Sequence, residues 1–209
     1  MKKRLLMPVL MRAAREFPIV VLSGPRQSGK TTLLRMLPFS TDYRLLEDPD
    51  EIARAKEDPR AWLSACRKPV IVDEIQNAPQ LFSYIRSLAD QDLRKKGQWF
   101  LTGSQDFGLM RGVTESLAGR AAILSLLPFS ISEIYGSSGI AWSMFSKHLI
   151  RGFFPNPALG RSGSGLWFGS YLQTYIEQDV RKLTQIEDLA AFRRFLHICA
   201  ARRGHVLNM

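Results

Sequence analysis

The fold of this chain is decided by one stretch, Gly24-Pro25-Arg26-Gln27-Ser28-Gly29-Lys30-Thr31-Thr32. The stretch matches the phosphate-binding loop pattern, in which a glycine and four further residues precede Gly-Lys-Ser/Thr. An apolar, β-branched run at 18–23 comes before it and predicts a buried strand. Residues 31–37 follow and predict the first turns of a helix that ends before Pro38. The order strand, glycine loop, helix favours a P-loop (Walker A motif) over a chance glycine turn.

Each residue type in the loop has a chemical reason. Gly24 and Gly29 permit backbone angles closed to other residues, so that successive N–H groups can surround an anion. Lys30 is expected to place its charge on the β- and γ-phosphates, and the Thr31 hydroxyl to ligate Mg²⁺. We therefore expect residues 24–32 together to bind ATP with Mg²⁺.

A second motif follows the apolar run Val70-Ile71-Val72, which ends in Asp73 and Glu74. Because ligands of open α/β sheets bind at the carboxyl ends of strands, both motifs should emerge on one edge. Asp73 would then hold Mg²⁺ through water, as in a Walker B motif, and Glu74 would orient or deprotonate the attacking water. The alternative is a strand that merely ends in solvated acids.

Three further residues are candidates for contact with the γ-phosphate. Ser104 and Gln105 follow a strand at 99–102 and could act as a sensor, although a simple strand-end turn explains them equally well. Arg120 precedes a strand at 121–127 and could act as an arginine finger in this or a neighbouring subunit. A surface arginine near a strand start is the alternative.

Five predicted strands alternate with helices, which indicates an α/β fold: a three-layer α/β/α P-loop NTPase with a mostly parallel five-stranded sheet. The strands are expected at 18–23, 42–46, 68–73, 99–102 and 121–127, with helices at 2–16, 48–56, 61–66 and 79–96. Beyond residue 135 the composition becomes rich in Gly, Ser and Pro. We predict an ATPase domain at 1–135 and a loop-rich, helical segment at 136–209, with helices at 167–183 and 187–202.

The composition is that of an ordinary globular chain, with 209 residues, 45% apolar and 23% charged. No apolar run is long enough to span a membrane, and no secretory leader is evident, so we expect a cytoplasmic protein without a membrane partner. Two distant cysteines and three histidines show neither a disulfide framework nor metal-ligand spacing. The net charge of +10 is compatible with a nucleic-acid partner, but scattered basic residues also suit a solvated face.

Several stretches together resemble one family, the prokaryotic AAA-type ATPases with a C-terminal domain of unknown function related to nucleases. The stretches are 24–34, 70–76, 101–105, 117–120 with 127–130, and 171–181. The resemblance implies an ATPase core of the additional-strand, catalytic-glutamate class. Its active positions would be Lys30, Thr31, Asp73 and Glu74, and Ser104-Gln105 would lie at the sensor position.

This sequence departs from the family pattern in two ways. Family members usually run to nearly twice this length, whereas residues 202–209 resemble the middle of a winged-helix-like unit. On this interpretation the unit is incomplete and the C-terminal domain is truncated. The family's Gly-Gly-aromatic-Pro-Glu is here Gly152-Phe153-Phe154-Pro155-Asn156, without the glutamate.

The leading hypothesis is an ATP-binding protein that hydrolyses ATP and couples the nucleotide state to a conformational change. No Asn-Lys-x-Asp motif for guanine is present, and a carboxylate pair suits activation of water better than phosphate transfer to an alcohol. The alternative from another class is a non-hydrolysing, nucleotide-gated module that binds nucleic acid or protein. Assembly into an oligomer is compatible with either hypothesis.

Overall fold

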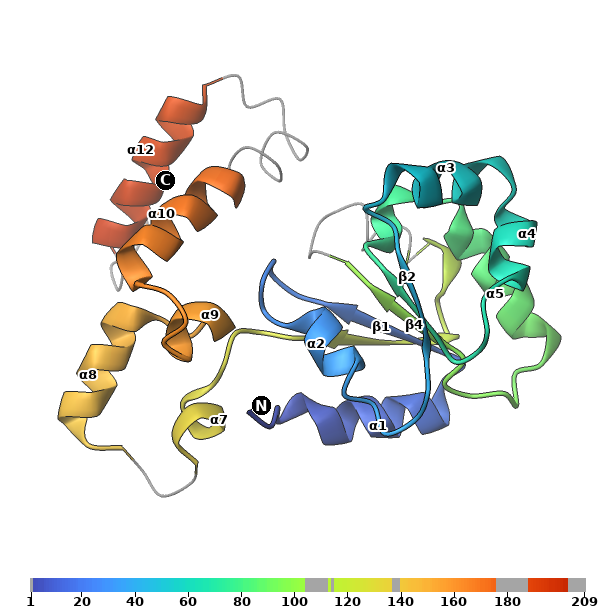
Figure 1. Cartoon of the computed structure of the whole chain (residues 1–209), viewed down its shortest axis with the longest axis horizontal. Helices are drawn as coiled ribbons and strands as arrows, with labels where there is room; N and C mark the ends of the chain where they lie inside the picture. The colour runs from blue at the N-terminus through green and yellow to red at the C-terminus, as the bar shows by residue number, and fades with distance from the viewer. Residues whose placement is uncertain (1, 104–112, 114, 137–139, 176–187, 203–209) are drawn as a thin grey trace. The chain divides into compact units, whose positions relative to one another are not determined.

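The computed structural model describes residues 2–103, 113, 115–136, 140–175 and 188–202 (Figure 1). Its contacts divide the chain into two compact units, Met1–Ser164 and Gly165–Met209. The segment 136–164, which the sequence analysis assigned to the C-terminal part, is grouped with the first unit. The domain boundary near residue 136 stays a prediction.

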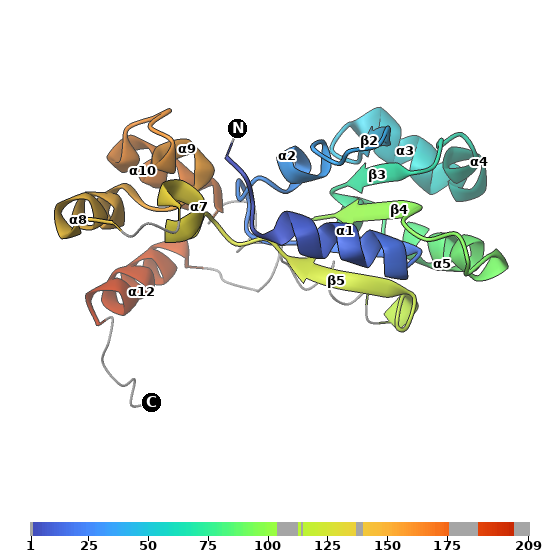
Figure 2. The ribbon, with the colours of Figure 1, turned by 90° about the horizontal axis from the view of Figure 1, so that it is seen from below.

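The first unit contains a five-stranded sheet in the order β2-β3-β4-β1-β5, and every strand pair is parallel. The strands are β1 (Ile19–Ser23), β2 (Asp42–Leu45), β3 (Val70–Asp73), β4 (Trp99–Thr102) and β5 (Ala121–Ser125). Figure 2 shows β2, β3, β4 and β5 in this order, with α1 (Leu6–Glu16) in front of the sheet. The predicted α/β fold with its parallel sheet is confirmed.

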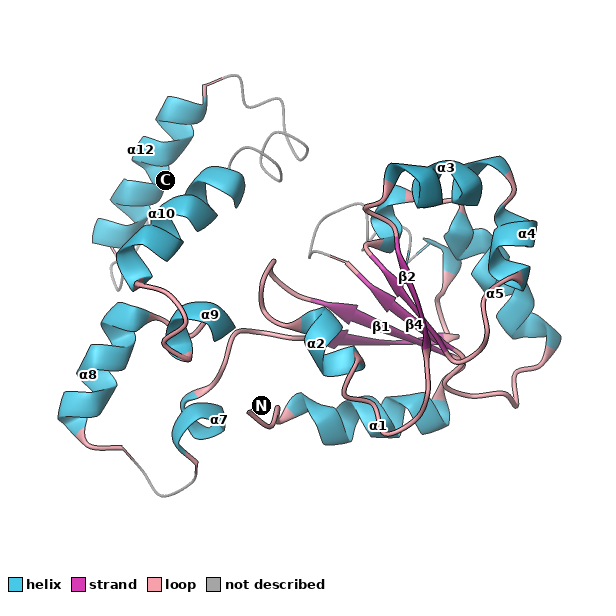
Figure 3. Ribbon diagram, in the orientation of Figure 1, coloured by secondary structure: helices cyan, strands magenta, loops and turns pink. Residues whose placement is uncertain are grey.

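Alternate residues of each central strand face opposite layers, so the sheet has a hydrophobic core on both sides. Val21, Val72 and Leu101 pack with α3 (Pro49–Glu57), α4 (Pro59–Ser64) and α5 (Leu81–Gln91). Their strand neighbours pack with α1 and α2 (Lys30–Leu34) on the other face. Figure 3 shows the helices on either side of the strands, which gives the three layers.

Helix starts follow local capping. Asp48 and Asp58 each accept a backbone N–H in the first turn of α3 and α4, and each precedes a proline at the first helical position. The structure therefore begins α4 at Pro59, earlier than the predicted residue 61. The helix α5 ends at Gln91, short of the predicted residue 96, since Asp92 accepts the N–H of Arg94 and starts a turn.

The segment after β5 contains more helix than its Gly, Ser and Pro content predicted. Its helices are α7 (Ile131–Tyr135), α8 (Trp142–Arg151) and α9 (Pro155–Ala158). Ser130 and Glu133 form a capping box at the start of α7, a Ser-x-x-Glu signal that the loop-rich composition obscured. A short 3₁₀ turn, η1 (Ile75–Asn77), follows β3.

The second unit contains α10 (Ser164–Tyr175), whose first residue belongs to the first unit, and α12 (Leu189–Ala201). Trp167 stacks on Tyr171 within α10, with ring centroids 5.0 Å apart. Asp188 caps α12 by accepting the N–H of Ala191. The predicted helices at 167–183 and 187–202 agree with these elements where the chain is described. Within the described residues, no helix has the length and apolar character needed to cross a membrane.

Candidate functional site

The P-loop joins the end of β1 to the start of α2. Gly24 and Gly29 have φ angles of 146° and 95°, and Gln27 adopts a left-handed φ of 61°. Left-handed backbone at a non-glycine residue is costly and is concentrated at functional sites. Lys30 is buried, and its Nζ donates to the carbonyls of Gly24 (2.9 Å) and Pro25 (3.1 Å). The lysine charge is thus held inside the loop.

The loop is packed against the segment that follows β5. A Cβ added at Gly24 would lie 2.3 Å from the carbonyl oxygen of Leu126, so only glycine fits there. On the other side of the loop, a Cβ at Gly29 would meet Arg4 Nη1 at 3.7 Å and Pro155 Cγ at 3.8 Å. The Phe-Pro-Asn stretch singled out in the sequence therefore lies beside the P-loop.

The Asp73 carboxylate, at the end of β3, accepts hydrogen bonds from side chains of α2, β2 and β4. Thr31 Oγ1 donates to Asp73 Oδ2 at 2.6 Å, and Tyr43 OH donates to the same oxygen at 2.8 Å. Thr102 Oγ1 donates to Asp73 Oδ1 at 2.5 Å. Asp73 is only 3% exposed, so hydroxyl donors replace water around it. The two predicted motifs meet on one edge of the sheet.

Tyr43 and Thr102 are members of the site that the sequence analysis missed. Burial, with the bond to Asp73, raises the pKa of Tyr43 to about 12, so its hydroxyl stays a donor at neutral pH. Thr102 ends β4 beside β3, and a polar residue at a strand's carboxyl end was the available signal for it. No local pattern marks Tyr43, because its role depends on the pairing of β2 with β3.

Glu74 follows β3 in a left-handed conformation, with φ 57° and ψ 44°. Gln76 Nε2 donates a hydrogen bond to Glu74 Oε2. Burial raises the pKa of Glu74 above its ordinary value, while the Gln76 hydrogen bond and the Lys30 charge oppose this rise. A carboxylate with a raised pKa is suited to accept a proton from water.

The residues at this edge fit a magnesium nucleotide. Asp73 and Thr31 offer a carboxylate and a hydroxyl oxygen, the hard donors that Mg²⁺ prefers, and Mg²⁺ sites commonly use one or two protein ligands with substrate phosphates. The fully buried Ser28 Oγ has no hydrogen-bond partner among the described residues, which leaves a polar atom within the loop available. Lys30 supplies the positive charge for an anion.

Of the remaining predicted residues, Arg120 is not brought to this site. Ser104 and Gln105 lie outside the described residues. Arg120 directly precedes Ala121, which pairs with Ile19 at the start of β1, so Arg120 is at the sheet edge opposite the P-loop. Its Nε donates to Asp90 Oδ1 at 2.7 Å. The prediction that Arg120 contacts the γ-phosphate of a nucleotide bound to its own chain is therefore wrong. Its role toward a neighbouring subunit stays a prediction.

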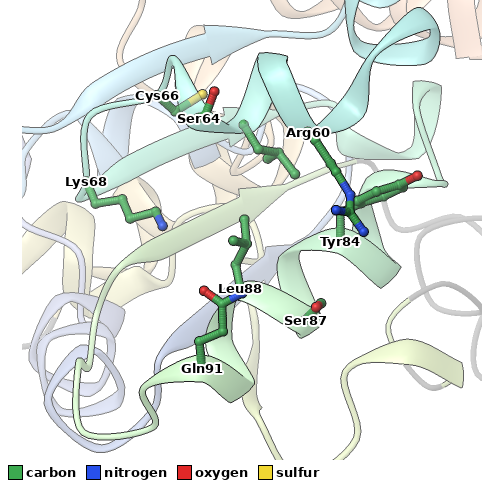
Figure 4. A pocket seen from close by; sticks show the side chains of 9 residues that line it. Arg60, Ser64, Cys66, Lys68, Tyr84, Ser87, Leu88 and Gln91 are labelled. Carbon is green, nitrogen blue, oxygen red and sulfur yellow. The ribbon is translucent and has the colours of Figure 1, made fainter.

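A separate pocket of about 500 Å³ lies between α4 and α5 (Figure 4). Arg60 lies over the ring of Tyr84, and Lys68 and Gln91 also line the pocket. Because Lys68 precedes β3, the pocket is at the amino end of the strands. None of the predicted site residues that the structure describes lines it.

A P-loop after the first strand and an Asp-Glu pair at the carboxyl end of β3 in a parallel sheet define a P-loop nucleotide-binding protein. The AAA domain family model matches residues 16–135, more than half of the chain. The chain belongs to this family of P-loop ATPases. A second model, a domain of unknown function (DUF8612), matches residues 143–209.

Two similar proteins are uncharacterized proteins of Mycobacterium tuberculosis and Mycobacterium bovis. Each is 31% identical over 203 residues, covering 95% of this chain and 44% of the relative. The chain thus spans less than half the length of these relatives. Among solved structures, a Walker-type ATPase of Pyrococcus abyssi has a TM-score of 0.54 at 14% identity, covering 90% of this chain and 74% of that one. This likeness supports the fold. The expected AAA-type family is confirmed, and a nuclease-related C-terminal domain stays a prediction.

Proposed function

We propose that this protein binds ATP with Mg²⁺ and hydrolyses it at the edge of the sheet formed by the P-loop and the end of β3. The observation that carries the proposal is the hydrogen bond from Thr31 to Asp73, with Glu74 as the next residue. This bond supports the proposal, because Thr31 and Asp73 could then share Mg²⁺ beside the lysine-bearing loop, with Glu74 as the candidate base. The alternative, a strand that merely ends in solvated acids, does not account for a hydrogen bond between Asp73 and the Thr31 hydroxyl.

Each residue has a distinct role in this proposal. The Lys30 ammonium and the backbone N–H groups of residues 24–32, except at Pro25, which has none, bind the phosphates. To reach them, Lys30 leaves the Gly24 and Pro25 carbonyls. Thr31 and Asp73 hold Mg²⁺, which supplies charge neutralisation on the phosphates when bound. Glu74 accepts the proton of the attacking water, and its partner Gln76 orients the carboxylate.

The nucleotide state is coupled to the conformation of the chain, because the contacts of the loop change with the ligand. The segment after β5 is the element best placed to respond. Leu126 and Pro155 lie against Gly24 and Gly29, the two glycines of the loop. Because Leu126 approaches Gly24 so closely, a shift of Gly24 toward it requires a matching shift of this segment.

The test is nucleotide affinity and phosphate release measured for wild type, Lys30→Ala and Glu74→Gln. We expect Lys30→Ala to weaken ATP binding by roughly 10- to 100-fold, the cost of a lost charged hydrogen bond. Glu74→Gln should retain ATP binding while turnover falls by about 10²- to 10⁴-fold. Glu47→Gln, an exposed glutamate in the same half of the chain, is the control.

A second candidate is a non-hydrolysing, nucleotide-gated module that binds nucleic acid, favoured by the net charge of +10. Binding of ATP without turnover in the wild type would support it. A steep dependence of DNA binding on salt would identify a phosphate-backbone partner. Turnover that depends on Glu74 would favour hydrolysis instead.

A further inference from the structure

Arg4 is a buried cation outside the two motifs, and it contacts the P-loop through the backbone carbonyl of Ser28. Its side chain is 7% exposed. Nη1 donates to the Ser28 carbonyl at 2.9 Å, and Nη2 donates to the Leu127 carbonyl at 2.6 Å. Nε donates to Glu133 Oε1 at 3.0 Å, and the guanidinium lies 4.6 Å from the ring centroid of Phe129. One side chain therefore joins the loop to the segment that follows β5.

Glu133 holds Arg4 in this position. The same Oε1 accepts the N–H of Leu5 at 2.7 Å, and Oε2 accepts the N–H of Ser130 at 2.9 Å. The charges and hydrogen bonds of these donors lower the pKa of Glu133 against the opposing effect of burial, so the carboxylate remains ionised at neutral pH. The ion pair fixes the orientation of the guanidinium, which leaves Nη1 directed at Ser28.

The contact to Ser28 has a consequence for the loop. The Ser28 carbonyl and the Gly29 N–H belong to the same peptide group, so a cationic donor on the oxygen polarises the N–H on the opposite side. The Gly29 N–H belongs to the set that a P-loop turns toward phosphate. A buried ion pair by itself is weak evidence of added stability. The chemistry of Arg4 therefore points to positioning of the loop.

We propose that Arg4 is a positioning residue for nucleotide binding: it orients and polarises the Ser28–Gly29 peptide and ties it through Glu133 to α7. The inference rests on the proposed ATP-binding function and deepens it. Nucleotide affinity would depend on a side chain from the N-terminal segment that does not itself touch the nucleotide. Occupation of the loop and docking of the 127–133 segment would stabilise each other by linkage.

The test compares Arg4→Lys with Arg12→Lys, measuring ATP affinity, KM and kcat. Lys keeps the charge but cannot reach three acceptors in the fork geometry of Arg. Arg12 is an exposed arginine of α1 that pairs locally with Glu16, so it is the matched control. We expect Arg4→Lys to raise Kd and KM for ATP by roughly tenfold, the worth of one charged hydrogen bond. At saturating ATP its kcat should stay within about twofold of wild type, because the loop is then fully occupied.

Thermal unfolding of the nucleotide-free variants shows whether each is folded. If Arg4→Lys is not folded at the assay temperature, Glu133→Gln decides, since it keeps the guanidinium but removes the charge that orients it. Weaker ATP binding by folded Glu133→Gln supports the proposal, and wild-type affinity overturns it. Likewise, folded Arg4→Lys with wild-type KM overturns the proposal, as does a fall in kcat alone. Wild-type protein that binds no ATP would instead overturn the proposed function itself.

Discussion

The Thr31 hydroxyl donates a 2.6 Å hydrogen bond to Asp73, a residue 42 positions away in the chain. Thr31 lies in the first turn of α2, and Asp73 is the last residue of β3. The parallel sheet places the carboxyl ends of β1, which leads into the P-loop, and of β3 on one edge. This brings the Thr31 hydroxyl to the Asp73 carboxylate. This contact organises the candidate site.

Thr31→Val removes that hydroxyl while keeping a β-branched side chain. We expect magnesium-dependent ATP binding to weaken by roughly 10- to 100-fold, because Asp73 loses a donor and Mg²⁺ loses a ligand. The measurement is ATP affinity with and without Mg²⁺, with Thr31→Ser as the control that keeps the hydroxyl. Equal losses in the presence and absence of Mg²⁺ would contradict the metal role.

Tyr43→Phe removes a second donor to Asp73 but leaves those of Thr31 and Thr102. We expect a loss of roughly tenfold or less in magnesium-dependent affinity, as for a single hydrogen bond. Because the pKa of Tyr43 is raised to about 12, the difference from wild type should persist from pH 7 to pH 9. Tyr84→Phe, in the pocket away from the site, is the control. A difference that disappears by pH 9 would argue against this donor.

Glu74→Gln should stabilise the nucleotide-free fold at neutral pH. Burial raises the pKa of Glu74 in the folded chain, so the folded state retains a proton that the unfolded state releases. Stability therefore falls as pH rises through this interval, and the ionised carboxylate carries a penalty at pH 7. We expect a higher melting temperature for Glu74→Gln at pH 7 and a gain that vanishes as pH falls toward 4. A gain of the same size at both pH values would refute this origin.

Gly24→Ala should weaken nucleotide binding more than the same change at another glycine of positive φ. The new Cβ would collide with the Leu126 carbonyl, which forces the loop or the segment after β5 to move. Gly119→Ala is the matched control, since Gly119 also has a positive φ but has no atom within 4 Å of an added Cβ among the described residues. We expect at least about tenfold weaker ATP binding for Gly24→Ala. Similar affinities in both variants would contradict the steric argument.

Arg120→Ala should leave ATP affinity unchanged, because Arg120 lies at the opposite edge of the sheet and pairs with Asp90. Arg86→Ala is the control, since Arg86 also faces Asp90, at 3.8 Å. Turnover measured over a range of protein concentrations tests a role in a neighbouring subunit. Turnover per chain that rises with concentration in the wild type and in Arg86→Ala, but not in Arg120→Ala, would establish the arginine finger. Identical profiles for all three would exclude it.

The strands and both motifs could be predicted because their signals are local. The P-loop is nine consecutive residues, and the Asp73-Glu74 pair directly follows an apolar run. Helix limits were less predictable where a capping residue and the local composition indicated different structures. At Ser130 a capping box starts a helix, although the composition of the segment predicts a loop. Arg120 precedes a strand of the predicted parallel sheet, so it belongs at the edge opposite the P-loop. Contact with a neighbouring subunit depends on assembly, which sequence spacing does not record.

The sequence by itself determined the class of fold and the chemistry available in the loop, since consecutive residues with fixed backbone preferences encode both. Only the tertiary structure decided which distant side chains complete the site. Tyr43, Thr102 and Arg4 reach Asp73 or Ser28 because parallel strand pairing and the docking of the N-terminal segment place them there. Such contacts depend on the order of strands in space, which no spacing along the chain records.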